Sequence, residues 1–222
     1  MVAGLIGHDV IATNLANVDT PGYKRDIPIT GSFQQEMVRS LAGSGRGGQV
    51  ESTPIGLLGY GAYVHSIGSD HSQGQLIETQ GTLDLGIEGD GYFVVRSPSG
   101  DLLTRSGSFR LSTSGMVMTV NDMPLLGMSG PIIIPPEAAD IEILADGTVY
   151  VDGRVHDRLS IVSLDNRNLA EKVGDGLFRV PRGSARPAGS GSFVVRQGFL
   201  EMSNVDVISE MTRMITGMRT YE

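Results

Sequence analysis

The chain has 222 residues, no cysteine and a formal net charge of −8. This acidic balance argues against binding to nucleic acid, which requires a basic surface. Without cysteine there is no disulfide framework, no thiol nucleophile and no cysteine-ligated metal site. No apolar stretch is long enough to insert into a membrane, and the opening "MVAGLIG" lacks the basic region of a signal peptide.

The segment 2–17 is predicted to be a helix because apolar side chains recur in it at helical spacing. The turn "NVDTPGY" ends this helix, since Pro21 cannot continue its hydrogen bonds and Gly22 can adopt a positive φ. Asn14 and Asn17 have two interpretations: they form the turn, or they are buried polar groups that set the register of a helix bundle. For Asn17 the turn is favoured.

The composition changes twice after this turn. Gly and Ser around "GSGRGG" indicate an extended connector, and β-type alternation begins near residue 62. We therefore expect four regions along the chain: an N-terminal helix at 1–22, a connector at 23–61, a β-rich domain at 62–197 and a C-terminal helix at 198–222.

Short strands separated by turns dominate the β-rich domain. In "TLDLGIEGDGYFVV" apolar and polar residues alternate, and the chain is expected to turn at Asp90–Gly91 into a second strand, 92–95. Two further Asp-Gly turns flank a strand at 148–151, and 181–192 reads as a loop. Strands at this spacing, without helical patterns between them, indicate an antiparallel sandwich or barrel.

The C-terminal segment returns to a helical period. Ser203 and Asp206 form an S-x-x-D capping signature, and an apolar stripe comes after it at three- and four-residue steps: Ile208, Met211, Ile215 and Met218, with Met214 beside it. Methionine makes an adaptable packing face. This face packs either on the chain's own β domain, or against the N-terminal helix and neighbouring copies of the chain.

No set of residues has the spacing of a catalytic or metal site. The four histidines are interpreted as solvated loop residues rather than ligands, and the Asp-Gly pairs as turns rather than calcium loops. Paired carboxylates such as Asp84 and Glu88, or Asp90, could act as acid and base in glycoside hydrolysis, but polar faces of strands and turns are the favoured interpretation. We therefore expect no enzyme activity, no cofactor and no metal.

Three motifs, in order, resemble the flagellar axial proteins, which are the rod, hook and hook-associated subunits. "NLANVDTPGYK" (14–24) is similar to their N-terminal signature and "GFLEMSNVDVISEMTRMITGMRTYE" (198–222) to their C-terminal one. Between them, "LDLGIEGDGYFVV", "LTRSGSFRLSTSG" and "PLLG" resemble the shared β domain of these proteins. The short body resembles a rod subunit, closer to the proximal type, with the distal type open. Family members carry further helical residues at both ends, so the chain is expected to be trimmed or shortened.

The resemblance implies a mainly β fold whose two terminal helices pair as a coiled-coil-like inner domain. It implies a structural subunit that polymerises through these helices into the drive shaft transmitting torque across the periplasm. The implied partners are copies of itself, other rod and hook subunits, and the flagellar type III export apparatus. The implied assembly residues are Asn14, Leu15, Ala16, Asn17, Thr20, Pro21, Gly22 and Tyr23 in the N-terminal motif, and Ser203, Asn204, Val205, Ile208, Met211, Met214, Ile215 and Met218 in the C-terminal helix.

Two other functions stay open on the sequence. One is a peptidoglycan-acting enzyme of the envelope, which a convergent acidic cleft with a carboxylate of raised pKa would favour. The other is a monomeric β-rich envelope binding module, which terminal helices packed on their own β domain would favour.

Overall fold

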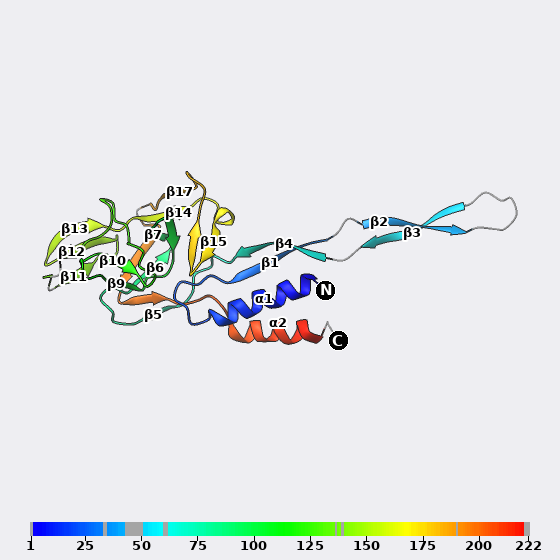
Figure 1. Cartoon of the computed structure of the whole chain (residues 1–222), viewed down its shortest axis with the longest axis horizontal. Coiled ribbons are helices and arrows are strands. Elements are labelled where there is room, and N and C mark those ends of the chain that lie inside the picture. Colours follow the sequence, from blue (N-terminus) through cyan, green and yellow to red (C-terminus); the bar gives the residue numbers. More distant parts are fainter. Residues whose placement is uncertain are drawn as a thin grey trace.

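The computed structural model describes residues 2–32, 35–42, 51–59, 62–135, 137–138, 140–189 and 191–219. It shows a rounded body built of strands and an arm that carries both terminal helices (Figure 1). The helices are α1 (Val2–Ala16) and α2 (Val207–Arg219), which lie side by side in the arm. The expectation of a mainly β protein with a helix near each end is therefore confirmed. Neither helix is long and apolar enough to cross a membrane, among the residues described.

The strands are short and numerous. They are β1 (Asp26–Ser32), β2 (Gln35–Ala42), β3 (Glu51–Gly59), β4 (Ala62–Ser69), β5 (Leu76–Glu78), β6 (Leu85–Gly89), β7 (Tyr92–Ser97), β8 (Gly100–Thr104), β9 (Phe109–Leu111), β10 (Val117–Thr119), β11 (Ile141–Ile143), β12 (Thr148–Val151), β13 (Arg154–Arg158), β14 (Ile161–Leu164), β15 (Glu171–Gly174), β16 (Leu177–Arg179), β17 (Ala185–Pro187), β18 (Phe193–Gln197) and β19 (Phe199–Glu201). One turn of 3₁₀-helix, Arg167–Leu169, precedes β15.

All strand pairs named here are antiparallel. A six-stranded sheet in the order β15-β16-β8-β7-β14-β17 forms one wall of the body, and a three-stranded sheet, β11-β12-β13, lies at its far end (Figure 1). Smaller pairs, β6 with β18, β9 with β10 and β5 with β19, complete the body. The described strands form no closed barrel.

Two Asp-Gly turns behave as expected, and a third does not. Asp152 and Gly153 both have positive φ, at 49° and 74°, which matches the right-handed twist of the β12–β13 hairpin. The Asp90–Gly91 turn joins two strands that do not pair: β6 pairs with β18, whereas β7 pairs with β8 and β14. The partner of β6 is β18, about 100 residues further along the chain, and local sequence cannot show a pairing over such a separation. Similarly, the expected loop 181–192 contains strand β17, which extends the large sheet.

The segment expected to be a connector contains paired strands. Strand β1 pairs with β4 into a two-stranded ribbon in the arm, and β2 pairs with β3. Residues 62–69, expected in the β domain, belong to the arm as β4. Residues 31–61 are rich in Gly and Ser and contain few alternating apolar residues, so their sequence predicted an unpaired chain. The "GSGRGG" stretch itself lies outside the described residues.

The start of α2 differs by three residues from the expected cap. Asp206, not Ser203, is the N-cap: its carboxylate accepts the Ile208 N–H at 3.1 Å and the Ser209 hydroxyl at 2.7 Å. These hydrogen bonds, that from Ser209 first, lower the pKa of Asp206. Ser203 instead accepts the Val205 N–H at 3.3 Å in the turn before the helix. The S-x-x-D match was thus one helical turn early, since Ser209 stands three residues after Asp206 and completes the cap instead.

An aliphatic core fills the body. Phe93 and Val95 of β7 are fully buried, and the Phe93 ring packs edge-on against Phe109 at 5.2 Å between centroids. Such aromatic and aliphatic packing explains how a body without tryptophan closes a core. A valine on the outer strand β13, Val155, is 64% exposed by comparison.

We expect Val95→Ala to lower the free energy of unfolding by about 2–3 kcal/mol, because it removes two buried methyl groups and leaves a cavity. Val155→Ala is the matched control: the same change on an exposed strand position should cost less than about 1 kcal/mol. Urea denaturation of both variants measures the two values. Equal losses would mean that β7 is not central to the core.

Candidate functional site

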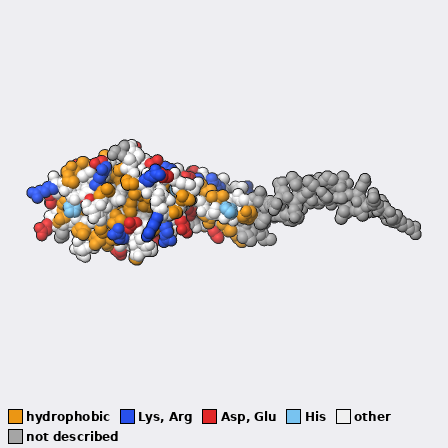
Figure 2. Space-filling model, turned by 90° about the horizontal axis from the view of Figure 1, so that it is seen from above, with side chains coloured by type: hydrophobic (Ala, Val, Ile, Leu, Met, Phe, Trp, Pro, Cys, Tyr) orange, Lys and Arg blue, Asp and Glu red, His pale blue; other side chains and the backbone are white. Residues whose placement is uncertain are grey.

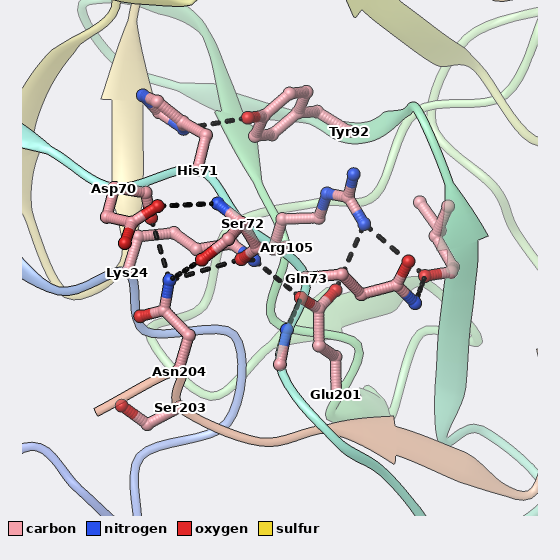
Figure 3. Close-up of polar contacts among 12 residues, drawn as sticks. Lys24, Asp70, His71, Ser72, Gln73, Tyr92, Arg105, Glu201, Ser203 and Asn204 are labelled. Carbon is pink, nitrogen blue, oxygen red and sulfur yellow. Dashed lines mark hydrogen bonds and ion pairs between the residues drawn. The ribbon is translucent and has the colours of Figure 1, made fainter. Parts of the chain in front are cut away.

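Three segments that are far apart in the sequence meet where the arm joins the body (Figure 3). They are the end of the N-terminal motif at Lys24, the segment 70–74 after β4, and the start of the C-terminal motif at 201–204. Arg105, immediately after β8, approaches from the body. We call this set the polar junction; it comprises Lys24, Asp70–Gly74, Arg105, Glu201 and Asn204.

A buried carboxylate lies at its centre. Glu201 Oε1 is 2.5 Å from Lys24 Nζ, and Glu201 Oε2 is 3.0 Å from Arg105 Nη1. The side chains of Lys24 and Glu201 are wholly buried, and that of Arg105 almost so. Burial lowers the pKa of Lys24, against the attraction of Glu201. Since one carboxylate faces two cations, the group carries excess positive charge.

Backbone oxygens balance that excess. Lys24 Nζ donates to the Ser72 carbonyl at 2.7 Å, and Arg105 donates to the Gly89 and Ile87 carbonyls at 2.7 and 3.3 Å. Glu201 Oε1 also accepts the Gly74 N–H at 2.9 Å. A buried ion pair is tolerated only when further hydrogen bonds satisfy its remaining groups. The junction meets most of that condition by drawing on backbone from both the arm and the body, although Arg105 Nε is buried without a hydrogen-bond partner.

Two features of the sequence bring these side chains together. Gly22 has φ of +70°, and a Cβ there would stand 2.2 Å from the Ser106 backbone nitrogen, so only glycine lets the N-terminal turn approach the body this closely. Its N–H donates to the Glu201 carbonyl at 2.7 Å. Pairing of β19 with β5 fixes Glu201 opposite Leu76. The N-terminal motif therefore docks directly on the C-terminal one.

A second layer of contacts ties the junction to α2. Asn204 accepts the Arg25 N–H at 2.7 Å and donates to the Asp70 and Ser72 carbonyls at 2.8 and 3.1 Å. Arg25 pairs with Asp70 at 3.0 Å and lies 3.8 Å from Glu210 of α2. Burial opposes ionisation of Asp70, but the hydrogen bonds from Ser72 and the positive charge of Arg25 together outweigh it and lower its pKa. The contacts of Asn204 and Arg25 thus fix the direction in which α2 leaves the junction.

Asn14 joins α1 to the ribbon. It is almost fully buried; its Oδ1 accepts the Asp26 N–H at 2.8 Å and the Tyr23 hydroxyl at 3.2 Å, while its Nδ2 donates to the Asp26 carbonyl at 2.9 Å. Lys172 of β15 reaches the same place, bonding Asp26 at 2.9 Å and lying over the Tyr23 ring. Asn14 is therefore a buried link to the start of β1, which neither sequence interpretation described.

The remaining N-terminal motif residues form the turn. Asn17 accepts the Thr20 hydroxyl at 3.2 Å, which bears out the turn interpretation. Leu15 is half-buried and Ala16 is exposed at the end of α1. Pro21 lies between the turn and the body and is half-buried.

The apolar stripe of α2 faces away from the rest of the chain. Its side chains are 48–77% exposed: Ile208, Met211, Ile215 and Met218. Another face of α2 is turned inward, with Glu210 buried and Met214 partly buried. There Gly217 comes so close to His8 of α1 that a Cβ would stand 2.9 Å from the imidazole Nε2. The stripe therefore does not pack on α1 of the same chain, nor on its β body.

His71 was expected to be solvated but is buried in the junction. Its Nδ1 is 2.8 Å from the Tyr92 hydroxyl, and its ring packs against Phe178 at 5.1 Å between centroids (Figure 3 shows the Tyr92 contact). Burial, followed by the positive charges of Lys24, Arg167 and Arg105, lowers its pKa from 6.5 to about 4. The imidazole is thus neutral at pH 7, and its Nδ1 shares a hydrogen bond with the Tyr92 hydroxyl.

Sequence reasoning found only part of this site. Lys24 and Glu201 matched the two terminal motifs but were not among the expected assembly residues, and Arg105 and His71 were missed. A lysine, an arginine and a glutamate carry no local sign of burial in their own stretches of sequence. The available signal was that the N-terminal motif contains a lysine, Lys24, and the C-terminal motif a glutamate of opposite charge, Glu201. Within the described residues no group of three potential metal ligands occurs.

The comparisons with known proteins agree with this geometry. Residues 7–24 match the family described as "Flagella basal body rod protein", residues 86–151 the "Flagellar hook protein FlgE/F/G D1 domain", and residues 196–222 the "Flagellar basal body rod FlgEFG protein C-terminal". The two terminal matches contain Lys24 and Glu201, so the buried ion pair joins one matched segment to the other.

Curated relatives match nearly the whole chain. The flagellar basal-body rod protein FlgG of Bacillus subtilis (strain 168) is 34% identical over 96% of this chain and 85% of its own length. FlgG of Caulobacter vibrioides is 33% identical over 100% of this chain and 88% of its own, and FlgF of the same organism 30% over 96% and 82%. These matches identify an axial protein of the flagellum. The chain belongs to the flagellar basal-body rod protein family.

We expect Glu201→Gln to destabilise the protein by about 3–5 kcal/mol, because it leaves Lys24 and Arg105 as two buried cations without a counter-charge. Lys24→Met should cost less, about 1–3 kcal/mol, since Glu201 keeps Arg105 and the Gly74 N–H. Glu88→Gln, at a half-exposed pair with Arg196, is the matched control and should change stability by less than about 1 kcal/mol. Chemical denaturation ranks the three variants, and a larger loss for Lys24→Met would contradict the central role of Glu201.

The buried neutral His71 predicts a pH dependence. In the unfolded chain it takes up a proton below about pH 6.5, whereas in the folded protein it does so only near pH 4. Stability from this group is therefore complete above pH 6.5 and is lost as the pH falls towards 4. The difference in unfolding free energy between the wild type and His71→Gln should shrink over that window and be constant between pH 7 and 8. A difference independent of pH down to 4 would show that His71 has the same pKa in the folded protein as in the unfolded chain.

Proposed function

We propose that the chain is a structural subunit of the flagellar basal-body rod that polymerises through its terminal helices. The family and the match of both terminal motifs support this. The observation that carries it is the exposed stripe of α2: four apolar side chains on one helix face are 48–77% exposed in the described chain. Exposed apolar faces of this kind mark interaction sites, and in a rod subunit the partner is another copy.

The finer architecture is part of the same proposal. Helices α1 and α2 pair as a coiled-coil-like inner domain, and the β body, with its sheets packed as a sandwich, forms the outer wall. The regions 1–22, 62–197 and 198–222 correspond to these layers, with 23–61 joining them, except that β4 at the start of 62–197 lies in the arm. The close approach of Gly217 to α1 supports the helix pairing.

The location and partners are inferred from the family. In the proposed rod the subunit lies in the flagellar basal body, crosses the periplasm as part of the drive shaft, and contacts other rod and hook subunits. Export through the flagellar apparatus without a cleaved signal peptide belongs to the proposal. The relatives include both FlgG and FlgF proteins, and the proximal position stays a prediction.

The two rival functions gain no support. A carboxylate of raised pKa would favour the enzyme. Among the described carboxylates, hydrogen bonds lower the pKa of three: Asp70, Asp146 and Asp206. Of the pair suspected of acid–base chemistry, Glu88 binds Arg196 and Asp84 accepts from Thr79. Packing of the α2 stripe on the β body would favour the binding module, but the stripe is exposed instead.

We expect Ile215→Asp to prevent incorporation into the rod and to abolish motility, because a carboxylate buried in a subunit contact without a partner costs several kcal/mol. The melting temperature of the isolated subunit should not change, since Ile215 is exposed in the single chain. Thr212→Asp, at an exposed position outside the stripe, is the control and should assemble. The assays are swimming in soft agar, electron microscopy of basal bodies and calorimetry. Normal motility of Ile215→Asp would remove the stripe as an interface.

A further inference from the structure

A large groove opens between the arm and the body. Its walls are the C-terminal turn of α1 with Thr13, the β1–β4 ribbon, and the stretch 171–177 that begins with β15. Its volume is about 1410 Å³, above the roughly 300–1,000 Å³ typical of small-molecule sites. The groove therefore has the size to hold a piece of polypeptide.

The ribbon side of the groove is apolar and uncovered. Ile27 and Ile29 of β1 and Ile67 of β4 are 38%, 49% and 53% exposed. A two-stranded ribbon is marginally stable unless a further layer covers it. Figure 2 shows hydrophobic side chains at the surface of the narrow arm as well as the rounded body. The arm thus presents a second unpartnered apolar surface besides the stripe of α2.

The stripe and the groove lie on opposite sides of the helix pair. The stripe runs from residue 208 to 218, about 15 Å at the rise of an α-helix. In a single chain α2 packs on α1, with the stripe directed away, so a chain cannot fill its own groove with it. Since α1 forms one wall of the groove, a helix placed there would extend the existing helix pair. Two different surfaces that complement each other make a heterologous contact, which builds a filament.

The charges that remain unpaired are complementary as well. Within the groove, Lys172 is paired with Asp26 and Arg167 with Asp90. The carboxylates of Glu171 and Asp175 line the groove without an ion pair among the described residues. On α2, Arg213 is paired with Glu210, and Arg219, just past the end of the stripe, makes no ion pair in the described part of the chain.

From these observations we infer that the groove is the docking site for a second copy of this chain. The occupant is the α2 stripe of that copy, oriented so that Arg219 faces Glu171 and Asp175. The inference rests on the proposed rod function and names the surface that receives the assembly helix.

Cysteine cross-linking tests it directly, because the natural chain has no cysteine. Two differently tagged full-length subunits, one with Ile215→Cys and one with Ile29→Cys, are co-expressed in motile cells and oxidised. We expect a disulfide-linked heterodimer that carries both tags. Met128→Cys in place of Ile29→Cys is the matched control, since Met128 is 70% exposed on the body outside the groove, and should give none. Absence of the heterodimer in assembled rods overturns the inference.

Charge exchange gives an independent test. Arg219→Glu should lower the number of rods per cell about tenfold, because it places three like charges together. Glu171→Arg with Asp175→Arg should have a similar effect, and all three changes in one chain should restore assembly. Rescue cannot come from the helix alone, so it supports the docking geometry; failure of rescue contradicts it.

The two proposals fail differently. If rods assemble, Ile215→Asp blocks them, and Ile215→Cys cross-links to Leu5→Cys of α1 in a neighbour but not to Ile29→Cys, the rod function stands and the groove is excluded. If Ile215→Asp assembles normally, the stripe is not an interface and both proposals fall.

Discussion

The contact between Glu201 and its two cations is the constraint on which the rest of the structure depends. The chain passes between arm and body through the N-terminal turn, the segment after β4, and the segment between β19 and α2, and all of these meet at this carboxylate. A charged group so deeply buried cannot be left unpaired without a large loss of stability. Lys24, Arg105 and Glu201 therefore have to adopt their native arrangement together, which fixes the arm on the body.

That constraint also explains the unusual exposure of α2. The helix is held at its base by Asp206, Asn204 and the pairing of Glu210 with Arg25, and further along by the close approach of Gly217 to α1. Polar contacts at the base leave the apolar stripe available. In a monomeric protein such a stripe would be a liability, whereas in a rod it is the means of assembly that we propose.

The sequence predicted local structure well where one periodicity dominated, and less well where distant segments decide. The helices, the strands and the two turns around 148–151 are explained by local patterns. The separation of β6 from β7 and the ribbon of β1 with β4 depend on pairing between segments far apart. The terminal motifs were recognised, but the burial of Lys24, His71 and Glu201 was not, because a charged or polar residue shows its burial only through partners elsewhere in the chain. The stripe was predicted as apolar, and only the fold shows that it is uncovered.

The separation of Lys24 from Glu201, 177 positions along the chain, has a consequence for the timing of folding. Local pairs such as β12 with β13 can form as soon as their residues are free, but the arm cannot lock onto the body until the C-terminal motif is also free. A chain that emerges from a ribosome or a narrow channel with its N-terminus first therefore remains unlocked until almost all of it has passed. The ion pair can therefore form only in a whole subunit. Only such a subunit acquires the rigid geometry that presents α2 to the growing end of the proposed rod.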